Sequence, residues 1–215
     1  MPRSLFGIGL AVMGLIGLPV SAGAVPIALT LDTTQAAVFQ QTLNNPCVIG
    51  NPSCNNPGGF TFTLLPVSPT SPQVTVSPTY TVDQIRTLLG GTSTFFLGID
   101  ISQAPGQGPY GLNSFTVNVG GSDAFQYTGP TDLSSSGNGF SDALLKTVDL
   151  GGFAGSANVI FSVNFSNDNG AREQFFLVSS QEPPAAVPEP ATLLLLGSTM
   201  AGLGFLQRRC ARHDT

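Results

Sequence analysis

Residues 148–179 read VDLGGFAGSANVIFSVNFSNDNGAREQFFLVS, and this stretch decides which fold we expect. Apolar side chains occupy every second position from Val159 to Phe165, a period of two that indicates a β-strand with one buried face. Residues 166–170 form a turn-rich segment, in which Asn-Gly supplies the positive φ angles that a tight turn needs. Residues 173–179 then return as a second apolar run. We therefore predict a β-hairpin here, the clearest one in the sequence.

The residues before this stretch also favour β-structure. Alternating or continuous apolar runs occur at residues 27–31, 60–64, 74–76, 95–101, 114–119 and 124–127. The run at 95–101 is continuous, which indicates a strand buried in the centre of a sheet. The runs at 114–119 and 124–127 are separated by Gly-Gly-Ser-Asp, which is typical of a hairpin turn. These patterns predict several strands joined by turns.

Only one segment carries the signals of a helix. Thr81 and Gln84 have the spacing of a capping box, and Gly90-Gly91 provides a stop signal. The apolar residues between these signals fall on one helical face: Val82, Ile85, Leu88 and Leu89. The sequence therefore predicts an all-β fold with one short helix at about residues 82–89.

The segment VDLGGFAG at residues 148–155 leads directly into the Val159 strand. It resembles the V-D-L-x-x-F-A-G stretch of jelly-roll β-sandwiches, which is frequent in galactose-binding-like and carbohydrate-binding modules. The resemblance implies a jelly-roll-like β-sandwich over residues 25–179. It implies no binding role for the segment itself, because a fold does not fix a function.

The N-terminal residues 1–24 have the composition of a secretory signal peptide. Arg3 precedes an apolar core at residues 5–20, and Ala22 and Ala24 form an A-x-A cleavage site. We expect this helix to be removed on export; an uncleaved N-terminal anchor is the alternative. The mature chain would then begin near residue 25, in an oxidising compartment.

The C-terminal end has three features in order. Residues 180–187 form a short proline-containing linker, and Pro188-Glu189-Pro190 follows. An uncharged apolar run at residues 191–206 comes next, and Arg208 and Arg209 follow that run. As a transmembrane helix the run would be about 24 Å long, which is short for a hydrocarbon core of ~30 Å. A plain membrane anchor is one interpretation of this tail.

The same three features resemble the PEP-CTERM sorting signal of exopolysaccharide-producing Gram-negative bacteria, here at residues 188–212. The resemblance implies that an exosortase-like enzyme processes the chain at or beside Pro188-Glu189-Pro190. It also implies that residues 191–206 hold the protein in the inner membrane only transiently, with Arg208 and Arg209 on the cytoplasmic side. The expected destination is the cell surface or the extracellular matrix, with exopolysaccharide as a further partner.

The charge balance limits the classes of partner. The chain has 12 acidic and 7 basic residues, for a formal net charge of −5. Between the terminal segments the basic residues are only Arg86, Lys146 and Arg172. Nucleic-acid binding needs clustered Lys and Arg to neutralise phosphates, so the sequence argues against it. The roughly 160 residues of the body suffice for one domain with a proper core.

Cys47 and Cys54 lie in a loop rich in Pro, Asn and Gly. Because the chain is expected to be exported, we predict a disulfide between them. A zinc site is disfavoured, since the body has no histidine and no other cysteine. Cys210, beyond the apolar run, is interpreted as a bystander thiol.

The sequence offers little catalytic chemistry. Its one histidine, His213, lies in the tail, so the body lacks a Ser-His-Asp or Cys-His nucleophile system. Asp168 and Glu173 flank the last turn and are the carboxylates considered for a glycosidase, although turn residues suffice to explain them. We therefore expect no enzyme activity and no cofactor.

Two alternatives to a non-enzymatic structural or adhesive role in an exopolysaccharide biofilm stay open. One is a calcium-dependent carbohydrate-binding module, with Asn167, Asp168 and Asn169 as candidate oxygen ligands. The other is a glycosidase-like enzyme. Sugar binding usually uses exposed aromatic platforms, but the chain has no Trp and only three Tyr.

Overall fold

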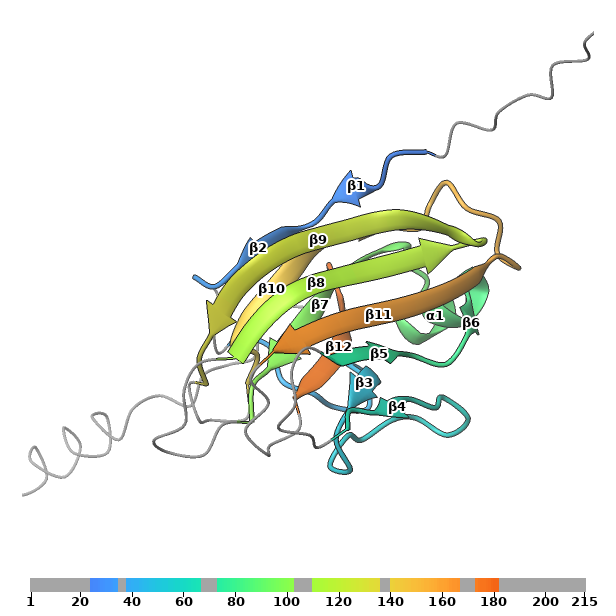
Figure 1. Cartoon of the computed structure of the whole chain (residues 1–215). Coiled ribbons are helices and arrows are strands. Elements are labelled where there is room, and N and C mark those ends of the chain that lie inside the picture. The colour runs from blue at the N-terminus through green and yellow to red at the C-terminus, as the bar shows by residue number, and fades with distance from the viewer. Residues whose placement is uncertain are drawn as a thin grey trace, which may run out of the picture.

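The computed structural model describes residues 24–34, 38–66, 73–102, 110–135, 140–166 and 173–181. These residues form two six-stranded β-sheets that face each other, with one short helix (Figure 1). The all-β class and the single helix predicted from the sequence are therefore confirmed. Among the described residues, no helix is long and apolar enough to span a membrane. The predicted transmembrane helix at residues 191–206 lies outside them.

We name the first sheet sheet A. Its strands, in spatial order, are β1 (Ile27–Ala28), β9 (Ser122–Leu133), β8 (Tyr110–Val119), β11 (Asn158–Ser166) and β5 (Gln73–Val76), and β6 (Tyr80–Thr81) also pairs with β11. β8 and β9 form the hairpin predicted across Gly120 and Gly121. These residues have φ angles of 62° and 89°, which glycine adopts without a steric penalty. Both strands extend well beyond the predicted runs.

We name the second sheet sheet B. Its strands, in spatial order, are β2 (Thr30–Asp32), β10 (Ala143–Asp149), β7 (Thr94–Asp100), β12 (Gln174–Ser179), β3 (Cys47–Gly50) and β4 (Thr63–Leu64). β7 corresponds to the run at residues 95–101, and it lies between β10 and β12 at the centre of the sheet. The prediction of a buried central strand is confirmed.

The predicted hairpin of residues 159–165 and 173–179 is wrong. β11 belongs to sheet A and pairs with β8 and β5, whereas β12 belongs to sheet B and pairs with β7 and β3. Residues 174–178 of β12 are all buried, because this strand is covered on both faces. A turn segment reverses the chain but does not determine which sheet the next strand enters.

Two other strands are shorter than the sequence predicts. The run at residues 27–31 is divided at Leu29 between β1 in sheet A and β2 in sheet B, because the buried Leu29 side chain packs into the core between the sheets. Within residues 60–64, only Thr63–Leu64 pairs as a strand, alongside β3.

The main core lies between the two sheets and is rich in phenylalanine. Phe115 of sheet A stacks on Phe175 of sheet B with ring centroids 5.6 Å apart. Phe161 of sheet A meets Phe95 of sheet B edge to face at 6.4 Å. Such aromatic pairs add about 0.5–1.5 kcal/mol beyond the burial of their area. These contacts hold the two sheets together face to face.

The helix α1 (Val82–Leu88) forms where its capping signals predict it. The Gln84 N–H donates to the Thr81 hydroxyl at 3.1 Å, and the Thr81 N–H donates to the Gln84 side-chain oxygen at 2.8 Å. These two bonds satisfy donors that a helix N-terminus otherwise leaves unpaired. Val82 and Ile85 are buried against the core.

The loop that follows β10 is fastened to α1. The guanidinium of Arg86 donates to the Leu150 carbonyl at 2.8 Å, and the Asp83 N–H donates to the Gly155 carbonyl at 2.9 Å. At the start of the loop, hydrogen bonds from the Gly151 N–H and the Ser93 hydroxyl hold the pKa of Asp149 below its usual value. The VDLGGFAG segment therefore has a structural role in this chain.

The outer face of sheet B carries a second, smaller apolar cluster. Its buried members are Phe39, Cys47, Leu144, Phe176 and Val178. Gly98 belongs to the same face, and a Cβ atom at this position would lie 2.4 Å from the Phe176 ring. The segment that contains Phe39 covers this face and brings the disulfide loop against it.

Candidate functional site

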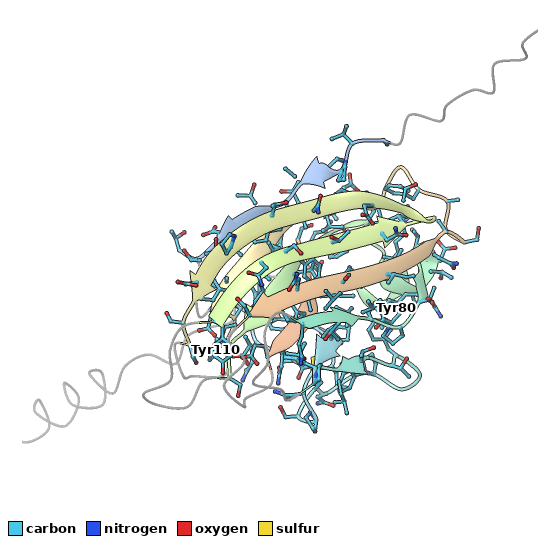
Figure 2. The ribbon with its side chains drawn as sticks, viewed as in Figure 1. Tyr80 and Tyr110 are labelled. Carbon is cyan, nitrogen blue, oxygen red and sulfur yellow. A yellow bond between two sulfur atoms is a disulfide. The ribbon has the colours of Figure 1, made fainter. Side chains whose placement is uncertain are left out.

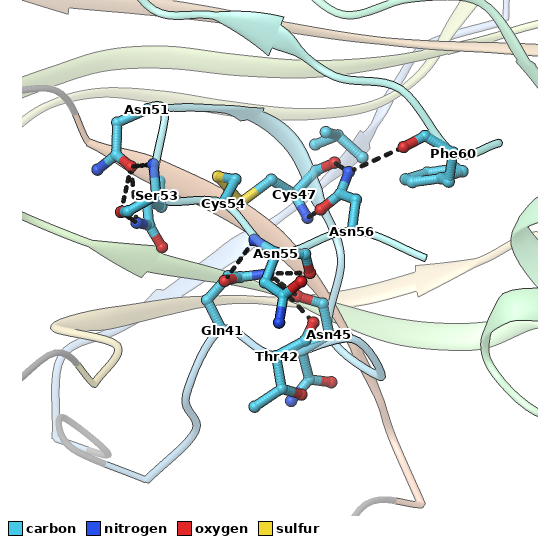
Figure 3. The surroundings of a disulfide bond; sticks show 12 residues. Gln41, Thr42, Asn45, Cys47, Asn51, Ser53, Cys54, Asn55, Asn56 and Phe60 are labelled. Atoms are coloured by element: carbon cyan, nitrogen blue, oxygen red, sulfur yellow. Dashed lines mark hydrogen bonds between the residues drawn. A yellow bond between two sulfur atoms is a disulfide. The ribbon is translucent and has the colours of Figure 1, made fainter. Parts of the chain in front are cut away.

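A disulfide joins Cys47, the first residue of β3, to Cys54 in the loop after that strand, with Cα atoms 6.0 Å apart (Figure 3). This confirms the pairing predicted from the sequence. Cys47 is fully buried in the outer cluster of sheet B. The covalent bond therefore fixes the loop to the sheet.

Side-chain amides brace the same loop (Figure 3). Asn56 bonds both backbone groups of Cys47: its oxygen accepts from the Cys47 N–H at 2.8 Å, and its NH₂ donates to the Cys47 carbonyl at 2.9 Å. Gln41 bonds both backbone groups of Asn55 in the same way. Its side-chain oxygen accepts from the Asn55 N–H at 3.0 Å, and its NH₂ donates to the Asn55 carbonyl at 2.8 Å. These pairs replace the backbone ladder that the loop lacks, so that the loop is ordered without being a strand.

A polar pocket lies beside this loop, at one end of sheet B. Its volume is about 290 Å³, and its lining residues are Gln40, Gln41, Asn51, Ser53, Asp100, Ser102 and Gln174. Asp100 and Gln174 face each other as Cα partners of β7 and β12. They lie two residues from Gly98 and Phe176 respectively, so they belong to the outer face of the sheet, where the apolar cluster ends.

The Gln174 side chain is held in one orientation. Its NH₂ donates to the Asn51 side-chain oxygen at 3.0 Å and to the Ser53 hydroxyl at 2.9 Å. Both N–H bonds are therefore used within the protein, and the carbonyl oxygen is its remaining polar atom. Because Asn51 and Ser53 follow β3 directly, β12 and the disulfide loop together position this amide.

Asp100 is the acidic residue of the pocket lining. Its pKa is raised to about 6, first by burial and second by the negative charge of Asp142. Asp142 is itself buried just before β10, where its carboxylate accepts from the Ile101 N–H at 2.7 Å. The pocket therefore contains a partly desolvated carboxylate that titrates near neutral pH.

The tyrosines do not form an aromatic platform. Tyr80, Tyr110 and Tyr127 are all buried, and Figure 2 labels the first two within the sandwich. Tyr80 stacks on Phe60 at 4.5 Å and donates its hydroxyl to the Thr61 carbonyl at 2.8 Å. Burial also raises its pKa above the ordinary value for tyrosine. These rings contribute to packing.

The outer face of sheet A has a regular polar surface, which we call the polar face: Ser114, Thr116, Asn118, Gln126, Thr128, Ser162 and Asn164. Its residues stand in register across three strands. Ser162, Thr116 and Gln126 form one row, and Asn164, Ser114 and Thr128 form the next. None of the seven side chains is charged.

Most other residues that the sequence singled out lie outside the described part of the chain. These are Ala22, Asn167, Asp168, Asn169, Pro188, Glu189, Pro190, Arg208 and Arg209. Ala24 is the first described residue, and Glu173 is buried just before β12. Within the described ranges, no group of three His, Cys, Asp or Glu residues is placed to hold a metal ion.

Sequence reasoning missed the polar pocket. Its residues come from four separate segments, so no local spacing indicates them. One signal was present: the outer-face positions of two strands change from apolar or small to polar at Asp100 and at Gln174. A polar residue at an alternating position of a buried strand indicates that the apolar cover ends there.

Comparison with known families and proteins gives one match. Residues 186–209 match the PEP-CTERM protein-sorting motif. No curated protein and no solved structure matches the chain significantly. The match agrees with the resemblance noted at residues 188–212. The chain therefore carries a PEP-CTERM sorting motif, which marks an exported protein that is held at the membrane before an exosortase processes it.

Proposed function

We propose that the sorted protein acts at the cell surface or in the extracellular polysaccharide matrix, in a structural or adhesive role. The observation that carries this proposal is the polar face of sheet A. In a chain with a net charge of −5, this face presents seven neutral hydroxyl and amide side chains. At its hairpin end, Asn118 pairs with Ile160 and donates to the Asp123 carboxylate at 3.0 Å, so the uncharged part is centred on the rows of Thr116 and Ser114. Neutral polysaccharides present the matching hydroxyl groups.

The spacing of the polar face supports contact with an extended polymer. Rows two residues apart along a strand are separated by about 6.7 Å, and neighbouring strands by about 4.8 Å. The face therefore repeats its hydrogen-bonding groups in two directions. Val74 and Val76 border it on β5 and are exposed, which adds apolar surface for the carbon-bound faces of sugar rings.

We propose in addition that the sandwich has jelly-roll topology. When the two-residue strands β4 and β6 are set aside, successive strands from β3 to β12 alternate between the two sheets, except at the β8–β9 hairpin. The order β3-β12-β7-β10 in one sheet and β5-β11-β8-β9 in the other is the order that two Greek keys produce. This supports the relationship to sandwich modules that the VDLGGFAG segment suggested.

We also propose that the body is not an enzyme. Hydrolysis of a glycoside by the usual route requires two carboxylates on either side of the bond. Among the described residues, one carboxylate lines the polar pocket, that of Asp100, while Asp142 is buried and accepts a hydrogen bond from the Ile101 backbone. A pocket of this kind supports binding better than hydrolysis.

Co-sedimentation with insoluble exopolysaccharide from the producing bacterium tests the adhesive role. Thr116→Glu adds a charge at the centre of the polar face and should lower the bound fraction severalfold. Thr87→Glu adds the same charge on an exposed position of α1 and should bind like the wild type. Failure of the wild type to sediment, or equal binding by both variants, would contradict the proposal.

A further inference from the structure

We propose that the polar pocket beside the disulfide binds one neutral hexose unit, with Asp100 and Gln174 accepting hydrogen bonds from two adjacent hydroxyl groups. This inference rests on the proposed function in one respect: the matrix polysaccharide would supply the sugar. The site itself is argued from its own residues, which are separate from the polar face of sheet A. Its volume of about 290 Å³ is large enough for one monosaccharide unit.

Asp100 and Gln174 lie on adjacent strands and belong to the same face of sheet B. Asp100 and Gln174 are direct partners on antiparallel strands, and such pairs carry their Cβ atoms about 4.5–5.5 Å apart on one face. Both residues line the pocket, so it receives a carboxylate and an amide carbonyl from two adjacent strands. Two neighbouring hydroxyls on a sugar ring present two donors in a similarly close pair, so one ligand satisfies both acceptors.

Gln174 is prepared for this role before the ligand arrives. Its NH₂ group is committed to Asn51 and Ser53, so its amide cannot rotate to offer a donor to the pocket. The disulfide and the Gln41–Asn55 bonds fix the loop that carries those two partners. A preorganised acceptor of this kind binds without losing much side-chain entropy.

A hydrogen bond from a ligand would stabilise the ionised form of Asp100. Burial and the Asp142 charge both disfavour its ionised form, and no hydrogen bond from a described residue offsets them. A ligand hydroxyl would restore part of the hydration that the carboxylate has lost. A bound cation would do so too, but among the described lining residues Asp100 is the one carboxylate, and the others are neutral. The lining therefore favours a neutral polyol.

Saturation-transfer difference NMR on the full-length chain in detergent tests the inference at pH 7.5. The probes are the methyl glycosides of glucose, galactose and mannose, with glucosamine and CaCl₂ as competing classes. We expect at least one neutral hexoside to give a signal. Asp100→Asn should weaken its binding about tenfold, as the loss of a hydrogen bond to a charged group predicts.

Two variants make the result specific. Asp123→Asn makes the same chemical change beside the β8–β9 hairpin, at the opposite end of β8 from the pocket, and should leave binding unchanged. Thr116→Glu on the polar face should also leave hexoside binding unchanged, even where it abolishes polymer binding. A failure of the adhesive proposal is thereby distinguished from a failure of this one.

Several results would overturn the inference. They are the absence of any hexoside signal, an unchanged signal in Asp100→Asn, a signal from glucosamine but from no neutral hexoside, and displacement of the hexoside by Ca²⁺. Misfolding does not confuse the outcome, because Asp100→Asn removes a partly buried charge that opposes folding at pH 7.5. The variant should therefore lose affinity while it gains thermal stability.

Discussion

At the scale of single residues, Asp100 lies in an environment that disfavours its charge. Sheet B withdraws it from water, and Asp142 adds a second negative charge from the neighbouring strand. Its pKa is about 6 in the folded protein, against an ordinary value of 3.8. The folded state therefore binds the Asp100 proton more tightly than the unfolded chain does. It follows that the ionised residue opposes folding at neutral pH.

We predict that Asp100→Asn stabilises the protein in a pH-dependent way. The stability associated with the Asp100 proton is fully present below pH 3.8 and is lost as the pH rises through about 6. A tenfold difference in proton affinity between the folded and unfolded states corresponds to about 1.4 kcal/mol. Partial exposure of the carboxylate reduces the effect, so the variant should gain about 1–2 kcal/mol at pH 7.5. At pH 4 the gain should approach zero.

Urea unfolding of both proteins at the two pH values measures the difference. Asp123→Asn, at an exposed hairpin position, is the matched control and should change stability little at either pH. A gain for Asp100→Asn that is the same at pH 4 and pH 7.5 would show that the charge of Asp100 is not the cause.

At the scale of elements, the disulfide loop links β3 to the walls of the pocket. Cys47 and Cys54 are 7 positions apart, so the bond closes a small ring. Cys47 begins β3, while Asn51 and Ser53 lie within the ring and hold Gln174 of β12. The loop therefore couples two strands of sheet B that also pair directly.

We predict that the double substitution Cys47→Ala/Cys54→Ala lowers the free energy of unfolding by about 2–3 kcal/mol. The open chain has more conformational entropy when it is unfolded, and the entropy model gives this range for so short a ring. Urea unfolding measures the change, and non-reducing peptide mapping first establishes that the wild-type cysteines are joined. Free thiols in oxidised wild-type protein, or equal stability of the two proteins, would contradict the account.

Elements defined by local signals were predictable from the sequence. The capping box at Thr81 and Gln84 sets the start of α1, and the glycine pair at Gly120-Gly121 sets the β8–β9 turn. Both signals act between residues close in sequence, where steric and hydrogen-bonding preferences are strong. The continuous apolar run of β7 similarly requires cover on both faces.

Sheet membership and the pocket were not predictable in the same way. The period of two in β11 shows that one face of the strand is buried. It does not show which strands pair with β11, because any neighbouring strand is compatible with the same pattern. The chain passes from β11 to β12 in the other sheet, where Phe176 and Val178 are buried in the outer cluster of sheet B, and this long-range packing has no local signal in the sequence. Asp100 and Gln174 become neighbours only through that pairing.

At the scale of the whole molecule, the chain combines a folded body with a sorting motif. The described residues from 24 to 181 build the two sheets, and the PEP-CTERM motif occupies residues 186–209 beyond them. If residues 191–206 formed a helix, it would be about 24 Å long, which is short for a hydrocarbon core of ~30 Å. Proline lacks the backbone N–H and disfavours a helix at the residue before it, so the sequence Pro188-Glu189-Pro190 favours a cleavage signal over a helical extension of the apolar run.

C-terminal mass spectrometry of the protein from its native host tests the central claim most directly. The wild type should end near Pro190 and lack Arg208 and Arg209, because processing removes the tail. The triple substitution Pro188→Ala/Glu189→Ala/Pro190→Ala should instead leave full-length protein in the membrane fraction. An intact C-terminus at Thr215 in both proteins would contradict the account, since a plain anchor keeps its tail.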